Sequence, residues 1–300
     1  ETGALKIPEE LIEKKDRLRP GKMLLVDTRE GRLIPDEELK HRYAVERPYG
    51  DWLREHLISL RDWETPKTPP VQLDGLQTLH RAFGYQYEEV FSLLPQLVNT
   101  HSDPIGAMGS DIPLAVFSRR HPLLFDYLKQ RFAQVTNPPI DAVREAFVTS
   151  CPVYLGSQGN LLEPCGEGCR VLRIENPILS KEDLYKIREN RVPGLRVVTV
   201  STVYPLGQTL DAAMQGVFEQ VRGAIPSLLA VAGVSQFLVE SRLRCAVSLI
   251  AETADARQVH HCAALLGYGA CAVNPYLAQD TIVWLCRQGR IPAGEDQAVQ

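Results

Sequence analysis

Polar residues stand at the ends of several stretches that are typical of buried strands. Ser201 and Thr202 follow a β-branched stretch, Glu252 and Thr253 end the stretch CAVSLIAET, and Asn274 ends ACAVN. In parallel β/α folds the carboxyl ends of the strands meet at one edge of the sheet, and ligands gather there. Glu252 is the one acid in this set, and it can serve as a general base, as a paired carboxylate or as a helix cap.

The turn GYGACAVNP (residues 267–275) offers a second kind of chemistry. Gly267 and Gly269 would let the backbone approach a phosphate, as such turns do in flavin- and phosphate-binding barrels. The same glycines also suit the C-terminal cap of a helix. Neither a G-x-G-x-x-G frame nor a basic partner accompanies them, so the sequence favours the cap.

Cysteine and histidine residues give no metal pattern. Cys165 and Cys169 are spaced C-x3-C in a glycine-rich loop with no second pair nearby, which indicates loop thiols. His260 and His261 are adjacent on a predicted helix and point about 100° apart, so they cannot share a metal. The sequence has no H-E-x-x-H, G-x-S-x-G, phosphate-binding-loop or Cys/His nucleophile motif. It therefore predicts no catalytic, cofactor-binding or metal-ligating set.

The elements that must position these residues alternate in the second half of the chain. The predicted strands are 195–202, 245–253 and 270–274, and the predicted helices are 209–222, 225–241, 255–266 with Asp255 near its start, and PYLAQDTIVWLC (275–286). Such alternation predicts βα units and a parallel sheet. One irregularity interrupts it: two helical segments adjoin at Val221–Ala224, where a strand is expected, so a strand is absent or the chain makes a local αα turn.

The first half of the chain is predicted to contain a hairpin and several helices. Residues 23–26 and 32–34 form the hairpin, Pro35 opens a helix, and the proline-rich stretch 65–72 is the best internal boundary. Residues 73–99 have helical periodicity, and a loop bearing Ser110 and Asp111 follows. The predicted class is α/β, with an open, degenerate (β/α) barrel-like parallel sheet after this mostly helical section and connector hairpin.

A further helix is predicted from His121 onward. Leu124, Leu128, Phe132 and Val135 recur at helical spacing and predict a core stripe. Pro138 ends the helix and pushes Asn137 out of the helical region, which predicts a rigid helix–turn–helix corner.

Composition excludes several classes of partner. The chain has 300 residues with a net charge of −4 and 44% hydrophobic residues, which is ordinary for a globular protein. It offers no basic surface for nucleic acid or membrane lipid, and no apolar run reaches the roughly 18 residues that span a bilayer. Its seven dispersed cysteines indicate reduced thiols in a cytosol-like compartment.

Six segments occur in an order that resembles one family. They are GYQYEEV, GAMGSDIPLAVFS, PLLFDYLKQRFAQVTNPPIDAVRE, YLGSQGNLLEP, IPSLLAVAGV and ARQVHHCAALLGYGACAVNPYLA. Together they resemble the central domain of the glutamate synthase large subunit. The stretch RLRPGKMLLVDTREGRLIPDEELK resembles the end of the amidotransferase domain that precedes it. The predicted division is therefore a connector over residues 1–70 and a central domain over 71–300.

The resemblance implies a part of an enzyme that makes two glutamates from glutamine and 2-oxoglutarate. In that family an amidotransferase domain with a cysteine nucleophile releases ammonia. The ammonia passes through a tunnel to an FMN domain that receives electrons through an iron–sulfur cluster. The central domain resembles a flavin barrel without its cofactor, joins the two catalytic domains and helps to wall the tunnel. The expected partners are these two domains of the same polypeptide, in the cytoplasm or, for a plant source, the plastid stroma.

No cofactor is expected in this segment, and we expect the segment alone to be inactive. The first cysteine is Cys151, so the N-terminal nucleophile is missing, and the FMN loops and cluster ligands would lie beyond Gln300. The candidates for contact with other domains or with the tunnel are Ser110, Asp111, Asn137, Glu252 and Asn274.

Two other functions stay open, and the chain departs from the family at one place. The alternatives are a free-standing enzyme that binds FMN or phosphate through Gly267 and Gly269, and a protein-binding module derived from a truncated synthase. Members of the family carry a hydrophobic strand before IPSLLAV, whereas here Arg222-Gly223-Ala224 runs straight into Ile225. An open sheet edge at this place would favour self-association.

Overall fold

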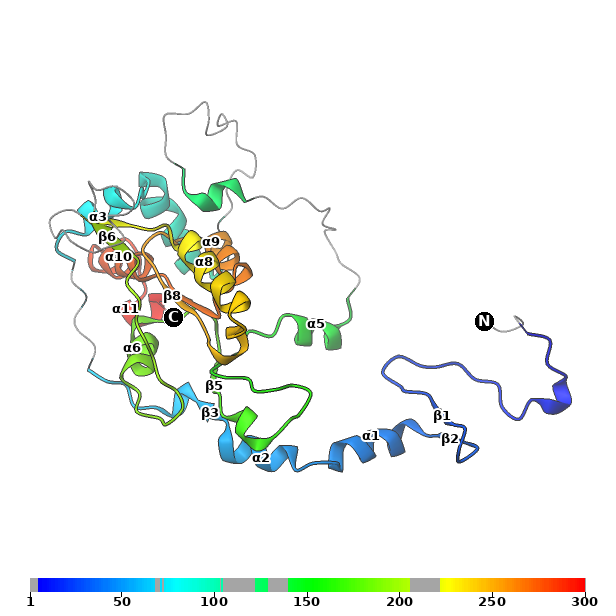
Figure 1. The fold of residues 1–300 in the computed structure, drawn as a ribbon. Coiled ribbons are helices and arrows are strands. Elements are labelled where there is room, and N and C mark those ends of the chain that lie inside the picture. Colours follow the sequence, from blue (N-terminus) through cyan, green and yellow to red (C-terminus); the bar gives the residue numbers. More distant parts are fainter. Residues whose placement is uncertain are drawn as a thin grey trace. The chain divides into compact units, whose positions relative to one another are not determined.

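The computed structural model describes residues 5–67, 71, 73–102, 104, 122–128, 140–205 and 222–299. The chain divides into two compact units, residues 1–55 and residues 56–300 (Figure 1). The boundary between residues 70 and 71 stays a prediction. None of the described helices is long and apolar enough to cross a membrane.

A hairpin forms in the first unit, as predicted. β1 (Leu25–Asp27) pairs antiparallel with β2 (Arg32–Ile34). In the turn, Asp27 Oδ1 accepts hydrogen bonds from two backbone N–H groups at 2.8 and 3.0 Å, and Gly31 adopts a positive φ of 67°. Asp and Gly suit these positions because a carboxylate can bond its own backbone and glycine has no Cβ to clash. The helical elements of this unit are η1 (Glu9–Leu11), α1 (Asp36–Val45) and α2 (Tyr49–His56), which ends at the boundary.

The first unit buries few apolar side chains. Among its described residues, the buried apolar ones are Ile34 and Leu39, while Leu5, Leu11 and Leu24 are exposed. Small domains are stable only when they bury a large part of their apolar surface. These residues therefore do not form a core that could stabilise the unit by itself.

The second unit is mixed α/β, which confirms the predicted class. β5 (Leu172–Ile174) lies between β3 (Ile58–Ser59), its parallel partner, and β4 (Val153–Leu155), its antiparallel partner. β8 (Ile250–Glu252) pairs parallel with β9 (Ala272–Asn274), and β6 (Val203–Pro205) pairs antiparallel with β7 (Arg222–Ala224). These sheets are small, and none closes into a barrel among the described residues.

The other described elements of the second unit are helices and helical turns (Figure 1). In chain order they are η2 (Leu60–Asp62), α3 (Leu76–Ala82), the π-helical turn η3 (Glu89–Leu93), α4 (Leu94–Thr100), η5 (Leu124–Tyr127), α5 (Ala142–Val148), η6 (Gly166–Cys169), α6 (Lys181–Glu189), α8 (Ser227–Glu240), η7 (Arg244–Ala246), α9 (Val259–Gly267), α10 (Tyr276–Arg287) and α11 (Glu295–Val299).

The deepest part of the core lies at β9 and α10. All three residues of β9 are buried, and Val273, Leu277 and Leu285 are completely shielded from solvent. A short apolar strand of this kind, covered on both faces, is typical of a parallel sheet in an α/β protein. The predicted helices over 225–241 and 275–286 correspond to α8 and α10, and the predicted strand over 270–274 corresponds to β9.

The predicted helix from His121 is wrong in the part that the structure describes. Only the single 3-10 turn η5 forms, and Leu128 is already extended. Phe125, rather than Leu124, points into the core, with 1% of its surface exposed against 38%. A 3-10 turn has three residues per turn rather than 3.6, so its side chains point in other directions than those of an α-helix. The predicted core stripe therefore does not form at Leu124 and Leu128. Phe132, Val135 and Asn137 lie outside the described residues.

Two predictions for the region before Ile225 also need correction. Residues 195–202 do not form the expected strand, because the ladder begins only at Val203. At Arg222–Ala224, where two helices were expected to adjoin, the short strand β7 pairs with β6 instead. The remainder of the predicted helix over 209–222 lies outside the described residues.

Phe125→Ala should lower the free energy of unfolding by about 3–5 kcal/mol, because it removes a fully buried aromatic ring. The neighbouring exposed Leu124→Ala should cost less than about 1 kcal/mol. Urea denaturation of both variants measures the difference. Equal losses would contradict the burial of Phe125 and favour the continuous helical stripe.

Candidate functional site

The structure brings two of the predicted site residues together at the carboxyl ends of β8 and β9. Glu252 and Asn274 are partners in the register of these strands. Glu252 accepts an ion-paired hydrogen bond from Arg188 on α6, and both side chains are partly exposed. Glu252 was predicted to be a general base, a paired carboxylate or a helix cap, and its contacts are those of a paired carboxylate.

Asn274 is completely buried and holds the strand end in place. Its amide Nδ2 donates to the backbone oxygen of Leu179 at 2.8 Å and to Gln279 Oε1 at 3.1 Å. Gln279 Nε2 donates to the same Leu179 oxygen at 2.8 Å. Asn274 Oδ1 has no hydrogen-bond partner among the described groups. The residue therefore ties β9, the first turn of α10 and the segment before α6 into one unit.

The other predicted positions do not join this pair. Ser110, Asp111 and Asn137 lie outside the described residues. Ser201 Oγ accepts from the N–H of Val203 at 3.2 Å, and the Thr202 carbonyl accepts from the N–H of Ile225 at 3.0 Å. These two side chains belong to the exposed approach to β6 rather than to the strand ends of β8 and β9.

The glycine-rich turn is the C-terminal end of α9. Gly269 has a φ of +116°, and a Cβ placed there would lie 2.3 Å from Ser235 Oγ on α8. The N–H groups of Tyr268, Gly269 and Ala270 all donate to carbonyls of the last helical turn. A phosphate would need these N–H groups free. The turn therefore does not fit the phosphate of an FMN molecule. Its contacts are those of a C-terminal helix cap, and Gly269 allows α9 to approach α8 closely.

The cysteines and histidines do not converge on a metal. All seven cysteines are free thiols, and within the described residues no three His, Cys, Asp or Glu side chains are grouped so that they could hold a metal ion. His260 Nε2 lies 3.1 Å from the backbone oxygen of Phe125, whereas His261 stacks on the Phe125 ring with centroids 4.5 Å apart. Both histidines thus contact η5.

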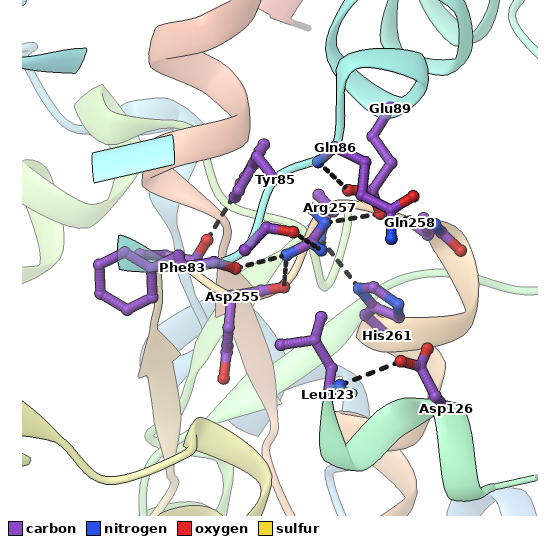
Figure 2. A network of polar contacts seen from close by, with 12 residues as sticks. Phe83, Tyr85, Gln86, Glu89, Leu123, Asp126, Asp255, Arg257, Gln258 and His261 are labelled. Carbon is purple, nitrogen blue, oxygen red and sulfur yellow. Dashed lines mark hydrogen bonds and ion pairs between the residues drawn. The ribbon is translucent and has the colours of Figure 1, made fainter. Parts of the chain in front are cut away.

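A second buried polar network centres on Arg257, in the loop between β8 and α9. Figure 2 shows its guanidinium between the segment that follows α3 and the start of α9. Nε donates to Glu89 at 2.8 Å, Nη1 to the carbonyl of Phe83 at 3.1 Å, and Nη2 to the carbonyl of Gly84 at 3.0 Å. Only 4% of the Arg257 side chain is exposed, so this charge is almost completely removed from water.

Glu89 neutralises the buried guanidinium. Besides Arg257, its carboxylate accepts from the N–H of Gln86 at 2.8 Å and from Gln258 Nε2 at 3.3 Å. Charge-assisted hydrogen bonds of this kind are about twice as strong as neutral ones. The pair therefore fixes the start of η3 against the start of α9.

Aromatic side chains cover the other side of the guanidinium. The Arg257 Cζ atom lies 4.4 Å from the centroid of the Tyr85 ring, and the Tyr85 hydroxyl donates to the carbonyl of Ala254 at 3.0 Å. Burial raises the pKa of Tyr85 well above its ordinary value, so the phenol stays neutral. His80 stacks on the same ring, and its Nε2 lies 2.7 Å from Thr281 Oγ1 on α10.

His261 is a neutral acceptor beneath Arg257. Its Nδ1 accepts from the N–H of Arg257 at 3.3 Å, so a neutral ring carries its proton on Nε2. Burial, and next the nearby Arg257 charge, lower the pKa of His261 to about 4.

Asp255 caps α8 and does not lie at the start of the helix that follows it in the sequence, where it was predicted. α9 begins at Val259, so Asp255 does not start it. Instead, the Asp255 carboxylate accepts from the Ser227 hydroxyl at 2.5 Å and from the Ser227 N–H at 3.1 Å, at the first turn of α8. It also accepts from the Thr253 hydroxyl. A carboxylate at this position satisfies N–H groups that the helix leaves free.

Comparison with known proteins identifies the family to which the chain belongs. Residues 78–225 and 218–300 match the family model of the glutamate synthase central domain, and residues 1–52 match that of the class-II glutamine amidotransferases. The chain belongs to the glutamate synthase central domain family. The predicted resemblance is confirmed.

Relatives match nearly the whole central-domain chain. It is 40% identical over 320 residues to the glutamate synthase [NADPH] large chain of Bacillus subtilis, and 35% identical over 339 residues to the glutamate synthase [NADH] of Schizosaccharomyces pombe. It is 36% identical over 310 residues to the ferredoxin-dependent glutamate synthase 2 of Synechocystis sp.. These matches cover 100, 100 and 94% of the chain but 21, 16 and 20% of the relatives, so the chain spans about a fifth of their length.

The Arg257 network of this central domain was missed in the sequence. Thr253, Asp255, Arg257 and His261 are all buried, although three of them carry ionisable groups. Ionisable residues are rarely buried unless they are paired. The segment AETADARQVHH places several of them between an apolar strand and an apolar helix, and this position could have indicated a buried, paired set. Their partners Glu89 and Ser227 are distant in the sequence, so only the fold reveals them.

The arrangement suits a structural junction of the central domain better than a catalytic site. The donors and acceptors of Arg257, Glu89, Asp255 and His261 are directed at one another and at backbone groups (Figure 2). A general base or nucleophile must instead point at a substrate.

Arg257→Met should lower the free energy of unfolding by about 3–5 kcal/mol, because Glu89 and two backbone carbonyls lose their buried partner. Glu89→Gln combined with Arg257→Met should cost less than the sum of the two single variants, since the residues act as a pair. Chemical denaturation of the four proteins measures this coupling. Arg287→Met breaks an exposed pair with Glu295 and serves as the control, with an expected cost below about 1 kcal/mol. A loss for Arg257→Met no larger than the control would contradict the assigned network.

The depressed pKa of His261 should make stability depend on pH. Between pH 6.5 and pH 4 the unfolded histidine binds a proton that the folded one does not, so stability falls as the pH falls through this range. The full contribution is on the order of 3 kcal/mol. His261→Asn should reduce this dependence in denaturation curves recorded across the range. Leu265→Ala, on the same helix, should lower stability while keeping the wild-type slope. An unchanged slope in His261→Asn would contradict the buried neutral ring.

Proposed function

We propose that this chain is the non-catalytic central part of a glutamate synthase, in which it links the glutaminase domain to the FMN synthase domain and helps to wall the ammonia tunnel. The parent enzyme would form glutamate from glutamine and 2-oxoglutarate. One observation carries the proposal: a match to the class-II amidotransferases over residues 1–52 is followed, in the same chain, by a central-domain match that begins at residue 78.

The exposed apolar residues of the first unit support this link. Its few buried apolar side chains do not form a core, and apolar residues such as Leu11 and Leu24 are exposed. Apolar residues left exposed in a unit without a core suit a surface that another part of a protein covers. In the proposal, the rest of an amidotransferase domain covers it.

The contacts in the second unit support a rigid, chemically inert spacer. The strand ends, where ligands would gather, are occupied by the Glu252–Arg188 pair and by the locked amide of Asn274. Dry walls suit an ammonia path, because excluding water keeps ammonia unprotonated and prevents its escape. Ser110, Asp111, Asn137, Glu252 and Asn274 remain the candidates for contact with the tunnel or the neighbouring domains.

The chemistry of the cofactors would belong to other parts of the enzyme. FMN and an iron–sulfur cluster would serve the synthase domain. The relatives are named for NADPH, NADH and ferredoxin, yet their identities to this chain are similar, at 35–40%. We infer that this segment does not select the electron donor.

A segment exchange tests the proposed function. This chain would replace the matching segment of the Bacillus subtilis large chain, and glutamine hydrolysis and glutamate formation would be measured together. The chimera should keep the two reactions coupled, and Arg257→Met in the chimera should weaken the coupling by loosening the spacer. The isolated chain should show neither flavin absorption nor turnover. A stoichiometric flavin spectrum, or glutamate formation by the isolated chain, would favour a free-standing flavin enzyme and overturn the proposal.

A further inference from the structure

One dipeptide of the chain combines two residues that can react with each other. Asp74-Gly75 is the single Asp-Gly pair in the sequence, and no Asn-Gly pair occurs. The main-chain nitrogen that follows an aspartate can attack the side-chain carboxyl carbon, because a five-membered ring forms. Glycine favours this attack, since it has no Cβ to shield its nitrogen. The pair stands directly before α3, for which Gly75 is the N-cap residue.

The structure places this pair in a tight turn. The N–H of Leu76 donates to the carbonyl of Leu73 at 3.2 Å, and Gly75 has a φ of +82° and a ψ of 1°. These angles are those of the third residue of a type II turn, where glycine is preferred because φ is positive. Asp74 and Gly75 therefore occupy the two central positions of the turn.

Neither reacting group is held by the described part of the chain. Both residues are exposed, and a Cβ added at Gly75 would meet no described atom within 4 Å. Among the described residues, the Asp74 carboxylate accepts no hydrogen bond and the Gly75 N–H donates none. The attack of the nitrogen on the carboxyl carbon therefore breaks no contact that these two groups make there.

We propose that Asp74 is a modification site, at which the aspartate isomerises to isoaspartate without an enzyme. The Gly75 nitrogen bonds to Cγ of the protonated Asp74 carboxyl group. The carboxyl hydroxyl leaves as water with the proton of the nitrogen, and a cyclic imide remains. Water then opens the imide: addition at the side-chain carbonyl restores aspartate, and addition at the main-chain carbonyl leaves the chain running through Cγ as isoaspartate. The water lost in the first step is regained in the second, so no other reactant is needed.

Isoaspartate loosens the start of α3. It adds one carbon atom to the main chain between Leu73 and Leu76, so the turn loses the geometry of its closing hydrogen bond. Leu76 is 3% exposed and packs with Ala254 and Leu277. Because the turn positions Leu76 in this cluster, isomerised chains should unfold at a lower urea concentration than native chains.

Asp141 offers a matched comparison. It is also exposed, but its carboxylate accepts from the N–H groups of Val143 at 3.1 Å and Arg144 at 3.0 Å, at the start of α5. The residue that follows it is Ala142, whose Cβ shields the nitrogen. A carboxylate held in this way is not free to meet the next nitrogen, so Asp141 should stay unchanged.

Prolonged incubation of the whole folded chain tests the proposal. Peptide mapping with mass spectrometry separates an isoaspartate peptide from its aspartate isomer of equal mass. The native Asp74 peptide should be progressively lost to such an isomer, while the Asp141 peptide stays unchanged. Asp74→Glu should abolish the change, because its longer side chain would have to form a six-membered ring. Ala142→Gly creates a second Asp-Gly pair at a bonded carboxylate and should isomerise more slowly than Asp74.

The same incubation in urea separates the effect of the fold from that of the dipeptide. In unfolded Ala142→Gly protein the two Asp-Gly pairs should react at similar rates, because no carboxylate is held. An Asp74 that stays native in the folded chain but isomerises in urea would overturn the proposal, as would equal rates at the two pairs in the folded variant. Urea denaturation of incubated wild-type and Asp74→Glu protein measures the effect on α3. Equal midpoints in the presence of isoaspartate would contradict the loosened turn.

Discussion

The second unit depends on a positive charge that has been removed from water. The Arg257 guanidinium is stable in the interior because Glu89 neutralises it and because its other N–H groups reach the carbonyls of Phe83 and Gly84. Those carbonyls lie just beyond α3, where a helix leaves backbone oxygens unsatisfied. The Arg257 side chain therefore bonds the carbonyls at the end of α3, holds η3 in place through Glu89 and lies over the Tyr85 ring. Arg rather than Lys suits this position, because a planar fork can serve several acceptors at once.

The loop between β8 and α9, together with the first turn of α9, contacts three other elements of the fold. Asp255 caps α8, Arg257 holds the segment after α3, and His261 stacks on Phe125 of η5. In a parallel β/α protein this loop stands at the edge of the sheet where ligands usually bind. Here the protein's own contacts occupy it. The position that forms an active site in related architectures is thus a junction here, and this supports the proposed spacer role.

The small sheets differ in how completely the structure provides their strands with neighbours. β9 keeps neighbours on both sides, since Val273 also bridges to Ile178, and it is fully buried. Among the described strands β8 pairs only with β9, and β6 pairs antiparallel with β7. The β-branched stretch over residues 196–201 is exposed and has no ladder to any described strand. Backbone groups on such a segment must bond to water or to another strand.

The sequence by itself determined the α/β class, the N-terminal hairpin, the helices at α8 and α10, the strand at β9 and the resemblance to the glutamate synthase central domain. These features depend on local periodicity, turn residues and long ordered motifs, all of which are local in the chain. The sequence could not show that Phe125 rather than Leu124 is buried, or that Asp255 caps α8 and not α9. It also could not show that residues 195–202 lack a ladder. Only the tertiary structure decided these, because a buried ring, a shared cap and a paired strand each need a partner that lies far away in the chain.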